Sequence, residues 1–131
     1  MIYIFDVYGV VYLDNRVNAG LVGVMKTLKD GGARVALASN MASGQKPLFW
    51  EGLDLKSFAT DFFCSGDLGV AKPEPSFYSH VAASLQVEAE QILFFDDSAA
   101  NIEAANSCGW HGFLYTDIPT TLEIIEKFNG R

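Results

Sequence analysis

The chain has 131 residues, half of them hydrophobic, which is enough for one domain with one core but not for two. Nine basic residues against 16 acidic ones give a net charge of −7, which argues against a general nucleic-acid binder because a polyanion would be repelled. No apolar run is long enough to span a membrane and no basic segment precedes the first strand, so we expect a cytoplasmic protein without a signal peptide or membrane contact.

Short apolar runs alternate with helical patterns along the chain. The runs that we expect to be strands cover residues 2–5, 34–38, 60–65, 91–95 and 112–115. Apolar residues at helical spacing follow the first strand at Leu21, Val24, Met25 and Leu28, and later helices open at Pro75, Ser98 and Pro119. This alternation predicts an α/β fold, a three-layer α/β/α Rossmann-like domain over residues 1–131 with a parallel five-stranded sheet.

Polar residues stand at the carboxyl ends of the predicted strands or before the helix that opens at Pro75. In chain order they are Asp6, Ser39, Asn40, Lys72, Asp96 and Asp97. Ligands bind at this edge in open parallel sheets, so these side chains are candidates for a common site. Taken singly, Ser39 and Asn40 also fit an ordinary turn, and Lys72 fits a solvated loop lysine.

Asp96 and Asp97 are harder to explain without a ligand. Two adjacent carboxylates that close the apolar run at residues 92–95 repel each other and have no packing role. A divalent cation removes that repulsion, and carboxylate oxygens together with a substrate phosphate suit Mg²⁺. The pair therefore predicts a Mg²⁺ site.

Four short motifs occur in the order and strand context of a known family. Asp6 opens DVYGV, Ser39-Asn40 ends VALASN, Lys72-Pro73 lies in GDLGVAKPEPSFY, and Asp96-Asp97 lies in ILFFDDSAANIEAAN. Together they resemble the haloacid dehalogenase-like (HAD) hydrolase superfamily. The stretches are most similar to the subgroup that contains glucose-1-phosphate phosphatases and the N-terminal phosphatase domain of epoxide hydrolases.

The resemblance implies a HAD-like fold and a small phosphorylated substrate. Asp6 would be the nucleophile that forms an aspartyl-phosphate. Ser39 and Asn40 would bind the phosphoryl group, and Lys72 would neutralise the charge that Asp6 and phosphate share. The implied ligands of Mg²⁺ are Asp6, the backbone carbonyl of Tyr8, Asp97, and Asp96 directly or through water.

Tyr8 departs from the pattern of the phosphatases, which usually carry Asp two residues after the nucleophile as general acid and base. A phenol with an ordinary pKa near ~10 is a poor substitute at neutral pH. Dehalogenases of the superfamily carry Tyr here and use no metal, but they lack the paired acids. We therefore predict a Mg²⁺-dependent phosphatase or phosphotransferase. The main alternative is a catalytically weak or inactive binding protein, and a metal-independent dehalogenase is a distant third.

The spacing of the motifs predicts a member without a cap domain. Asp6 to Ser39 spans 33 residues, enough for one flap and one helix, and Ser39 to Lys72 spans another 33. The site should therefore be open to water or covered by a second subunit of a homo-oligomer. We expect Lys72, in a loop beside Pro73, to be removable without leaving a cavity in the core.

Overall fold

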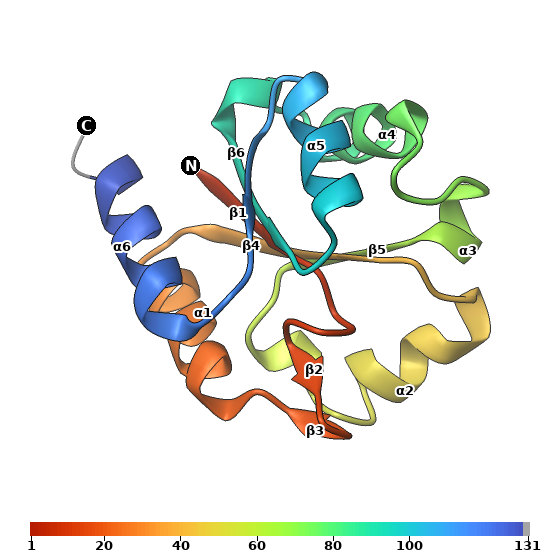
Figure 1. Ribbon diagram of the computed structural model, residues 1–131. Coiled ribbons are helices and arrows are strands. Elements are labelled where there is room, and N and C mark those ends of the chain that lie inside the picture. Colours follow the sequence, from red (N-terminus) through yellow and green to blue (C-terminus); the bar gives the residue numbers. More distant parts are fainter. Residues whose placement is uncertain (130–131) are drawn as a thin grey trace.

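The computed structural model describes residues 1–129, and a five-stranded sheet lies at its centre. The strands in chain order are β1 (Ile2–Phe5), β4 (Arg34–Ser39), β5 (Asp61–Cys64), β6 (Ile92–Asp96) and β7 (His111–Leu114). They are all parallel and lie in the order β5-β4-β1-β6-β7 (Figure 1). The predicted parallel five-stranded sheet is therefore confirmed, and each strand bound lies within one residue of the predicted one.

Helices cover both faces of the sheet. They are α1 (Ala19–Asp30), α2 (Lys46–Trp50), α3 (Ser65–Leu68), α4 (Pro75–Leu85), α5 (Ala99–Ser107) and α6 (Ile118–Asn129), with short 3₁₀ helices η1 (Ser43–Gln45), η2 (Leu55–Ser57) and η3 (Ala89–Gln91). Helices α1 and α6 pack with Tyr3 and Phe5 on one face, whereas α4 and α5 pack with Ile4 on the other (Figure 1). Neighbouring residues of β1 thus enter opposite cores, as the alternation of side chains along a strand requires. The three-layer α/β/α architecture is confirmed.

A short hairpin, β2 (Tyr12–Leu13) with β3 (Arg16–Val17), lies between β1 and α1. Its two turn residues, Asp14 and Asn15, both have left-handed backbone angles, with φ of 54° and 59°. Asp and Asn tolerate this conformation, which a two-residue hairpin turn needs. The hairpin is the flap that the spacing from Asp6 to Ser39 leaves room for, although its strands were not predicted individually.

The intervals that could hold a cap domain are short throughout residues 1–129. The hairpin fills the interval between β1 and α1, and α2 with η1 and η2 fills the interval between β4 and β5. The short helix α3 alone stands between β5 and the loop that leads to α4. In this described part of the chain no domain is inserted, and no helix has the length and apolar character needed to cross a membrane.

Candidate functional site

Parallel strands bring the polar strand ends together at one edge of the sheet. β1 lies between β4 and β6, with Phe5 level with Leu37 and Phe95. The backbone N–H of Asp6 donates to the carbonyl of Phe95 at 2.9 Å, so Asp6 is fixed at the end of the central strand. A pocket of about 130 Å³ opens at this point and is lined by Asp6, Tyr8, Ser39, Asn40, Lys72 and Asn101.

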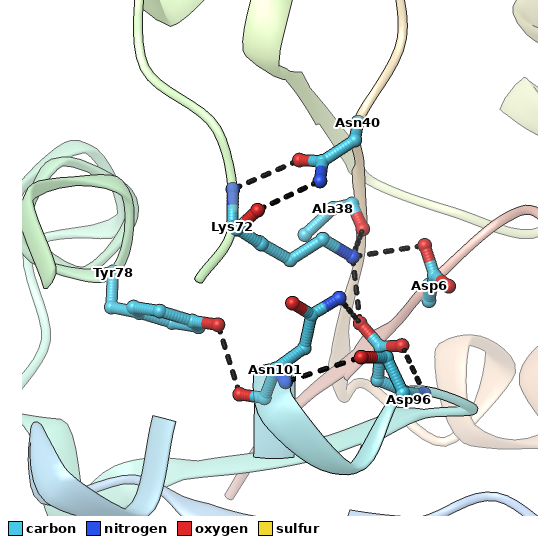
Figure 2. A network of polar contacts seen from close by, with 8 residues as sticks. Asp6, Ala38, Asn40, Lys72, Tyr78, Asp96 and Asn101 are labelled. Atoms are coloured by element: carbon cyan, nitrogen blue, oxygen red, sulfur yellow. Dashed lines mark hydrogen bonds and ion pairs between the residues drawn. The ribbon is translucent and has the colours of Figure 1, made fainter. Parts of the chain in front are cut away.

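Lys72 is the centre of the polar network at this edge (Figure 2). Its Nζ donates to Asp6 Oδ1 at 2.9 Å, to Asp96 Oδ2 at 2.7 Å and to the carbonyl of Ala38 at 2.8 Å. Its side chain is only 1% exposed. Lys72 is therefore not a solvated loop lysine. The expectation that its removal would leave no cavity is wrong, because the loop folds back and inserts the side chain between the strand ends.

Asn40 holds the loop in this position. Its side-chain amide donates to the Lys72 carbonyl, and its Oδ1 accepts from the Lys72 N–H, both at 2.9 Å. These two contacts fix the backbone of the residue whose ammonium enters the site. Asn40 also lines the pocket, so it can hold the Lys72 loop and still lie beside a substrate, as predicted.

The two buried carboxylates bonded to Lys72 are not equivalent. Asp96 is fully buried and also accepts hydrogen bonds from the Ser98 N–H at 2.9 Å and from Asn101 Nδ2 at 3.1 Å. Burial alone would raise the pKa of Asp96, but Lys72 and these hydrogen bonds outweigh it and hold that pKa below its ordinary value.

Asp6 is the less stabilised of the two carboxylates. Burial raises the pKa of Asp6 from 3.8 to about 7; Lys72 opposes the rise and the charge of Asp96 adds to it. A single ammonium cannot neutralise two carboxylates, and Asp96 has more donors. Without a further cation, Asp6 is therefore the carboxylate that is harder to ionise.

A third carboxylate completes a set of oxygen ligands. Asp6, Asp96 and Asp97 each offer an oxygen within 4.8 Å of the others. Asp97 is exposed and lies against Gly9, where a Cβ would collide with Asp97 Oδ2. Gly9 has φ of +85°, a conformation that favours glycine, so this turn is shaped to admit the carboxylate. Three hard oxygen donors at this separation fit Mg²⁺.

The turn after β1 leaves the backbone carbonyl of Tyr8 outside its own hydrogen bonds. Hydrogen bonds that close the turn after β1 are accepted by the carbonyls of Asp6, Val7 and Tyr12. The carbonyl of Tyr8 is not among these acceptors, so it remains compatible with the predicted role as a backbone ligand of the metal.

Ser39 carries an unusual buried hydroxyl. It is 0% exposed, and its Oγ has no hydrogen-bond partner within residues 1–129. Buried polar atoms are nearly always paired, because leaving one unpaired costs about 1–3 kcal/mol. Since Ser39 lines the pocket beside Asp6 and Lys72, a ligand oxygen in the pocket is a partner within its reach.

The comparison with known families decides the classification. A family model described as haloacid dehalogenase-like hydrolase matches residues 1–109. The chain belongs to this family. The predicted family resemblance is therefore confirmed.

The curated relatives of this HAD-like chain are longer proteins. Sesquiterpene phosphatase astK of Aspergillus oryzae is 27% identical over 113 residues, which is 83% of this chain and 56% of that protein. Other curated relatives include mammalian bifunctional epoxide hydrolases, and the chain spans only between 11% and 56% of the length of the relatives compared.

Two solved structures share the fold. An uncharacterized protein of Corynebacterium glutamicum has a TM-score of 0.81 at 23% identity, and the alignment covers 97% of this chain and 93% of that one. A HAD-family enzyme of Bacteroides thetaiotaomicron, crystallised with magnesium and inorganic phosphate, has a TM-score of 0.65 at 18% identity, covering 76% of this chain and 53% of that one.

Tyr8 lies at the mouth of the pocket of this HAD-like chain. Its side chain is 40% exposed and packs edge-on against Phe49, with ring centroids 5.4 Å apart. Tyr12 packs edge-on against the same two rings. The Tyr8 hydroxyl donates to Gln45 Oε1 at 3.4 Å. The ring is thus held by its neighbours, while its hydroxyl is held by one long contact at the surface.

Asn101 and Gly9 were not among the predicted site residues. Asn101 lines the pocket and bonds Asp96, and Gly9 admits Asp97. The position of Asn101 in the first turn of a helix directly after two acids is a signal that the sequence contains. The contact of Gly9 depends on the path of a neighbouring loop and has no such signal.

Proposed function

We propose that this chain is a Mg²⁺-dependent phosphatase or phosphotransferase that works through an aspartyl-phosphate on Asp6. The observation that carries the proposal is the pocket itself. It places the Asp6 carboxylate beside a buried ammonium and a buried hydroxyl that has no partner within residues 1–129, next to two further carboxylates. The phosphatase named among the relatives and the magnesium and phosphate bound by the Bacteroides enzyme support it.

Each polar residue of the pocket has a separate role in the proposed reaction. The Asp6 carboxylate attacks phosphorus, forming an Asp6 O–P bond while the bond from phosphorus to the leaving oxygen breaks. Lys72 keeps Asp6 in place and offsets charge on the phosphoryl oxygens, and the Ser39 hydroxyl donates to one of those oxygens. Water then attacks the phosphorus of the aspartyl-phosphate, which releases inorganic phosphate and restores the Asp6 carboxylate.

The carboxylates of Asp6 and Asp97 and the carbonyl of Tyr8 are the groups that would hold Mg²⁺. Asp96 already accepts three hydrogen bonds, so contact through a water molecule suits it better than direct ligation. When bound, the ion neutralises negative charge on the phosphoryl group.

Tyr8 stands where these phosphatases usually have the acid that protonates the leaving oxygen. Its side chain lines the pocket, and a phenol donates a proton poorly at neutral pH. The substrates that suit this site are therefore phosphates whose leaving group needs little protonation, such as aryl or acyl phosphates.

Tyr8→Asp should raise turnover of an alkyl phosphate by about tenfold while changing turnover of p-nitrophenyl phosphate little. A well-placed acid is worth ~10²–10⁴-fold. We expect less, because the carboxylate enters a site shaped around a phenol. Steady-state rates on one alkyl and one aryl substrate at the same Mg²⁺ concentration make the comparison, with Tyr8→Phe as the control that removes the hydroxyl and adds no acid. Unchanged rates on both substrates would show that Tyr8 is not a lost acid.

Mg²⁺ should raise the melting temperature of the wild-type protein, and Asp97→Asn should remove most of that rise. The reason is the separation of the three carboxylates, which repel each other until a cation joins them. A thermal-shift titration with MgCl₂ measures the effect. Asp30→Asn makes the same change of charge at the exposed end of α1, at the opposite edge of the sheet, and should keep the full rise. Equal rises in the two variants would contradict the assignment of Asp97.

Gly9→Ala should weaken Mg²⁺ binding at least severalfold, because the added Cβ displaces the Asp97 carboxylate. Gly32→Ala is a matched control. Gly32 has φ of +91°, so a substitution there meets similar backbone strain, but a Cβ at this position meets no atom of the described residues 1–129 within 4 Å. Isothermal titration with MgCl₂ should show weaker binding in Gly9→Ala alone; the same loss in both variants would trace the effect to strain rather than to Asp97.

A binding protein without turnover is the second candidate, favoured by the phenol at position 8. A hydrolysis screen over alkyl, aryl and acyl phosphates, with and without Mg²⁺, separates the two. Mg²⁺-dependent turnover that Asp6→Asn abolishes supports the enzyme. Absence of turnover on every substrate, with Mg²⁺ still bound, supports the binding protein.

Domain organisation, location, substrate and assembly belong to the same proposal. We expect one catalytic domain over residues 1–131, a cytoplasmic location and a small phosphorylated substrate rather than nucleic acid. With no inserted cap within residues 1–129 and Tyr8 exposed at the pocket mouth, a second copy of the chain in a homo-oligomer is the cover that we propose.

A further inference from the structure

Tyr78 lies outside the pocket but is joined to it by hydrogen bonds. It is fully buried in α4, and its ring packs edge-on against Trp110 and Phe94. Burial raises the pKa of Tyr78 well above its ordinary value, so its hydroxyl stays protonated. That hydroxyl donates to the backbone carbonyl of Asn101 at 2.9 Å (Figure 2).

The N-cap and first turn of α5, to which Tyr78 bonds, provide two of the three donors to Asp96. The Ser98 N–H reaches Asp96 Oδ1 and Asn101 Nδ2 reaches Asp96 Oδ2. Ser98 Oγ in turn accepts from the Asn101 N–H at 3.3 Å, so the turn is internally braced. A shift of this turn would therefore move both donors together and carry Asp96 with them.

The hydrogen bonds between Lys72, Asp96, Asn101 and Tyr78 form a closed ring of contacts. Lys72 and Tyr78 belong to one segment, since the loop that carries Lys72 leads directly into α4. Lys72 Nζ bonds Asp96, Asp96 bonds Asn101, and the Asn101 carbonyl bonds Tyr78. The Tyr78 hydroxyl thus adds a direct hydrogen bond between α5 and the segment from which Lys72 comes, beside the apolar packing of the two helices (Figure 2).

We propose that Tyr78 is a positioning residue. Its hydroxyl holds the first turn of α5, and through that turn it keeps the Asp96 carboxylate within hydrogen-bond distance of Lys72 Nζ. Without the hydroxyl, the partly buried Asn101 carbonyl lacks this donor, and the turn is free to shift toward other donors. Lys72 then holds Asp6 less firmly. The consequence for turnover rests on the function proposed above, whereas the consequence for Lys72 does not.

Tyr78→Phe tests the proposal because it keeps the ring and removes only the hydroxyl. Tyr3→Phe is the matched control: Tyr3 is also buried, and its hydroxyl donates to Asn129 Oδ1 toward the opposite edge of the sheet. The first readout is the rate at which the Lys72 ammonium protons exchange with water, followed by NMR on ¹⁵N-labelled protein. The second is kcat on p-nitrophenyl phosphate with Mg²⁺.

We expect Tyr78→Phe to speed the ammonium exchange and lower kcat, each by roughly tenfold, with both values unchanged in Tyr3→Phe. Unchanged exchange in Tyr78→Phe, or an equal rise in both variants, would overturn the proposal whatever the turnover. Faster exchange in Tyr78→Phe alone, with a wild-type protein that hydrolyses nothing, would uphold the positioning role and reject the phosphatase function instead.

Discussion

Asp6→Asn should abolish phosphatase turnover and, at the same time, stabilise the metal-free protein above neutral pH. Loss of the nucleophile should lower kcat by about 10⁴-fold or more. The gain in stability has a separate cause. Asp6 and Asp96 share one ammonium, and burial raises the pKa of Asp6 to about 7. Ionised Asp6 is therefore costly in the folded protein, and an amide is not.

The direction of the pH dependence follows from that pKa. In the unfolded chain Asp6 ionises near its ordinary pKa of 3.8, whereas in the folded protein it ionises only near about 7. Between these values the folded state binds more protons, so the wild-type free energy of unfolding falls as pH rises. The Asn variant lacks this fall. The stability of the variant relative to wild type should therefore grow from pH 4 to pH 7 and level off above.

Chemical denaturation in the presence of EDTA, at a series of pH values from 4 to 8, measures the difference. Asp30→Asn at the far edge of the sheet serves as the control for a lost charge and should show no such growth. A variant that loses turnover but follows the wild-type pH dependence would keep Asp6 as nucleophile and contradict the account of its buried charge.

Lys72→Met should lower the free energy of unfolding by about 3–5 kcal/mol at pH 7, because two buried carboxylates lose their cation. Met fills a similar volume, so the effect reports charge rather than a cavity. The carbonyl of Ala38 loses a donor as well. Phosphate affinity should fall with stability, since the ammonium that faces the phosphoryl group is gone.

The comparison for Lys72→Met is Lys29→Met. Lys29 donates to the carbonyls of Lys56 and Ser57 at the surface, at 3.5 Å and 3.3 Å, so its loss should cost less than about 0.5 kcal/mol. Adding Asp6→Asn to Lys72→Met should recover part of the stability, because only Asp96 then lacks its counter-ion. Equal losses in the two lysine variants would show that Lys72 is not the centre of the network.

The strand ends of the site could be predicted from the sequence because parallel strands align their carboxyl ends. Asp6, Ser39 and Asp96 need only their place after or at the end of an apolar run to be assigned to one edge. The same logic gives the order of layers, since apolar spacing separates strands from helices.

The burial of Lys72 could not be predicted in this way. It depends on two hydrogen bonds between the Asn40 side chain and the Lys72 backbone, which turn the loop inward. Such contacts between separate segments leave no periodic pattern in the sequence. The same holds for the hydrogen bond from Tyr78 to Asn101, which joins α4 to α5 on one face of the sheet. The hairpin turn at Asp14 and Asn15 is different, because its residue types already favour a left-handed turn.

Trapping of the covalent intermediate tests the central claim most directly. Wild-type protein is mixed with Mg²⁺ and an aryl or acyl phosphate and quenched with borohydride, which reduces an aspartyl-phosphate to homoserine, and the digest is read by mass spectrometry. We predict homoserine at position 6 in the wild-type protein, and none there without substrate or in Asp6→Asn. Steady hydrolysis of the same substrate with Asp6 unmodified, or with homoserine at another aspartate, would contradict the account.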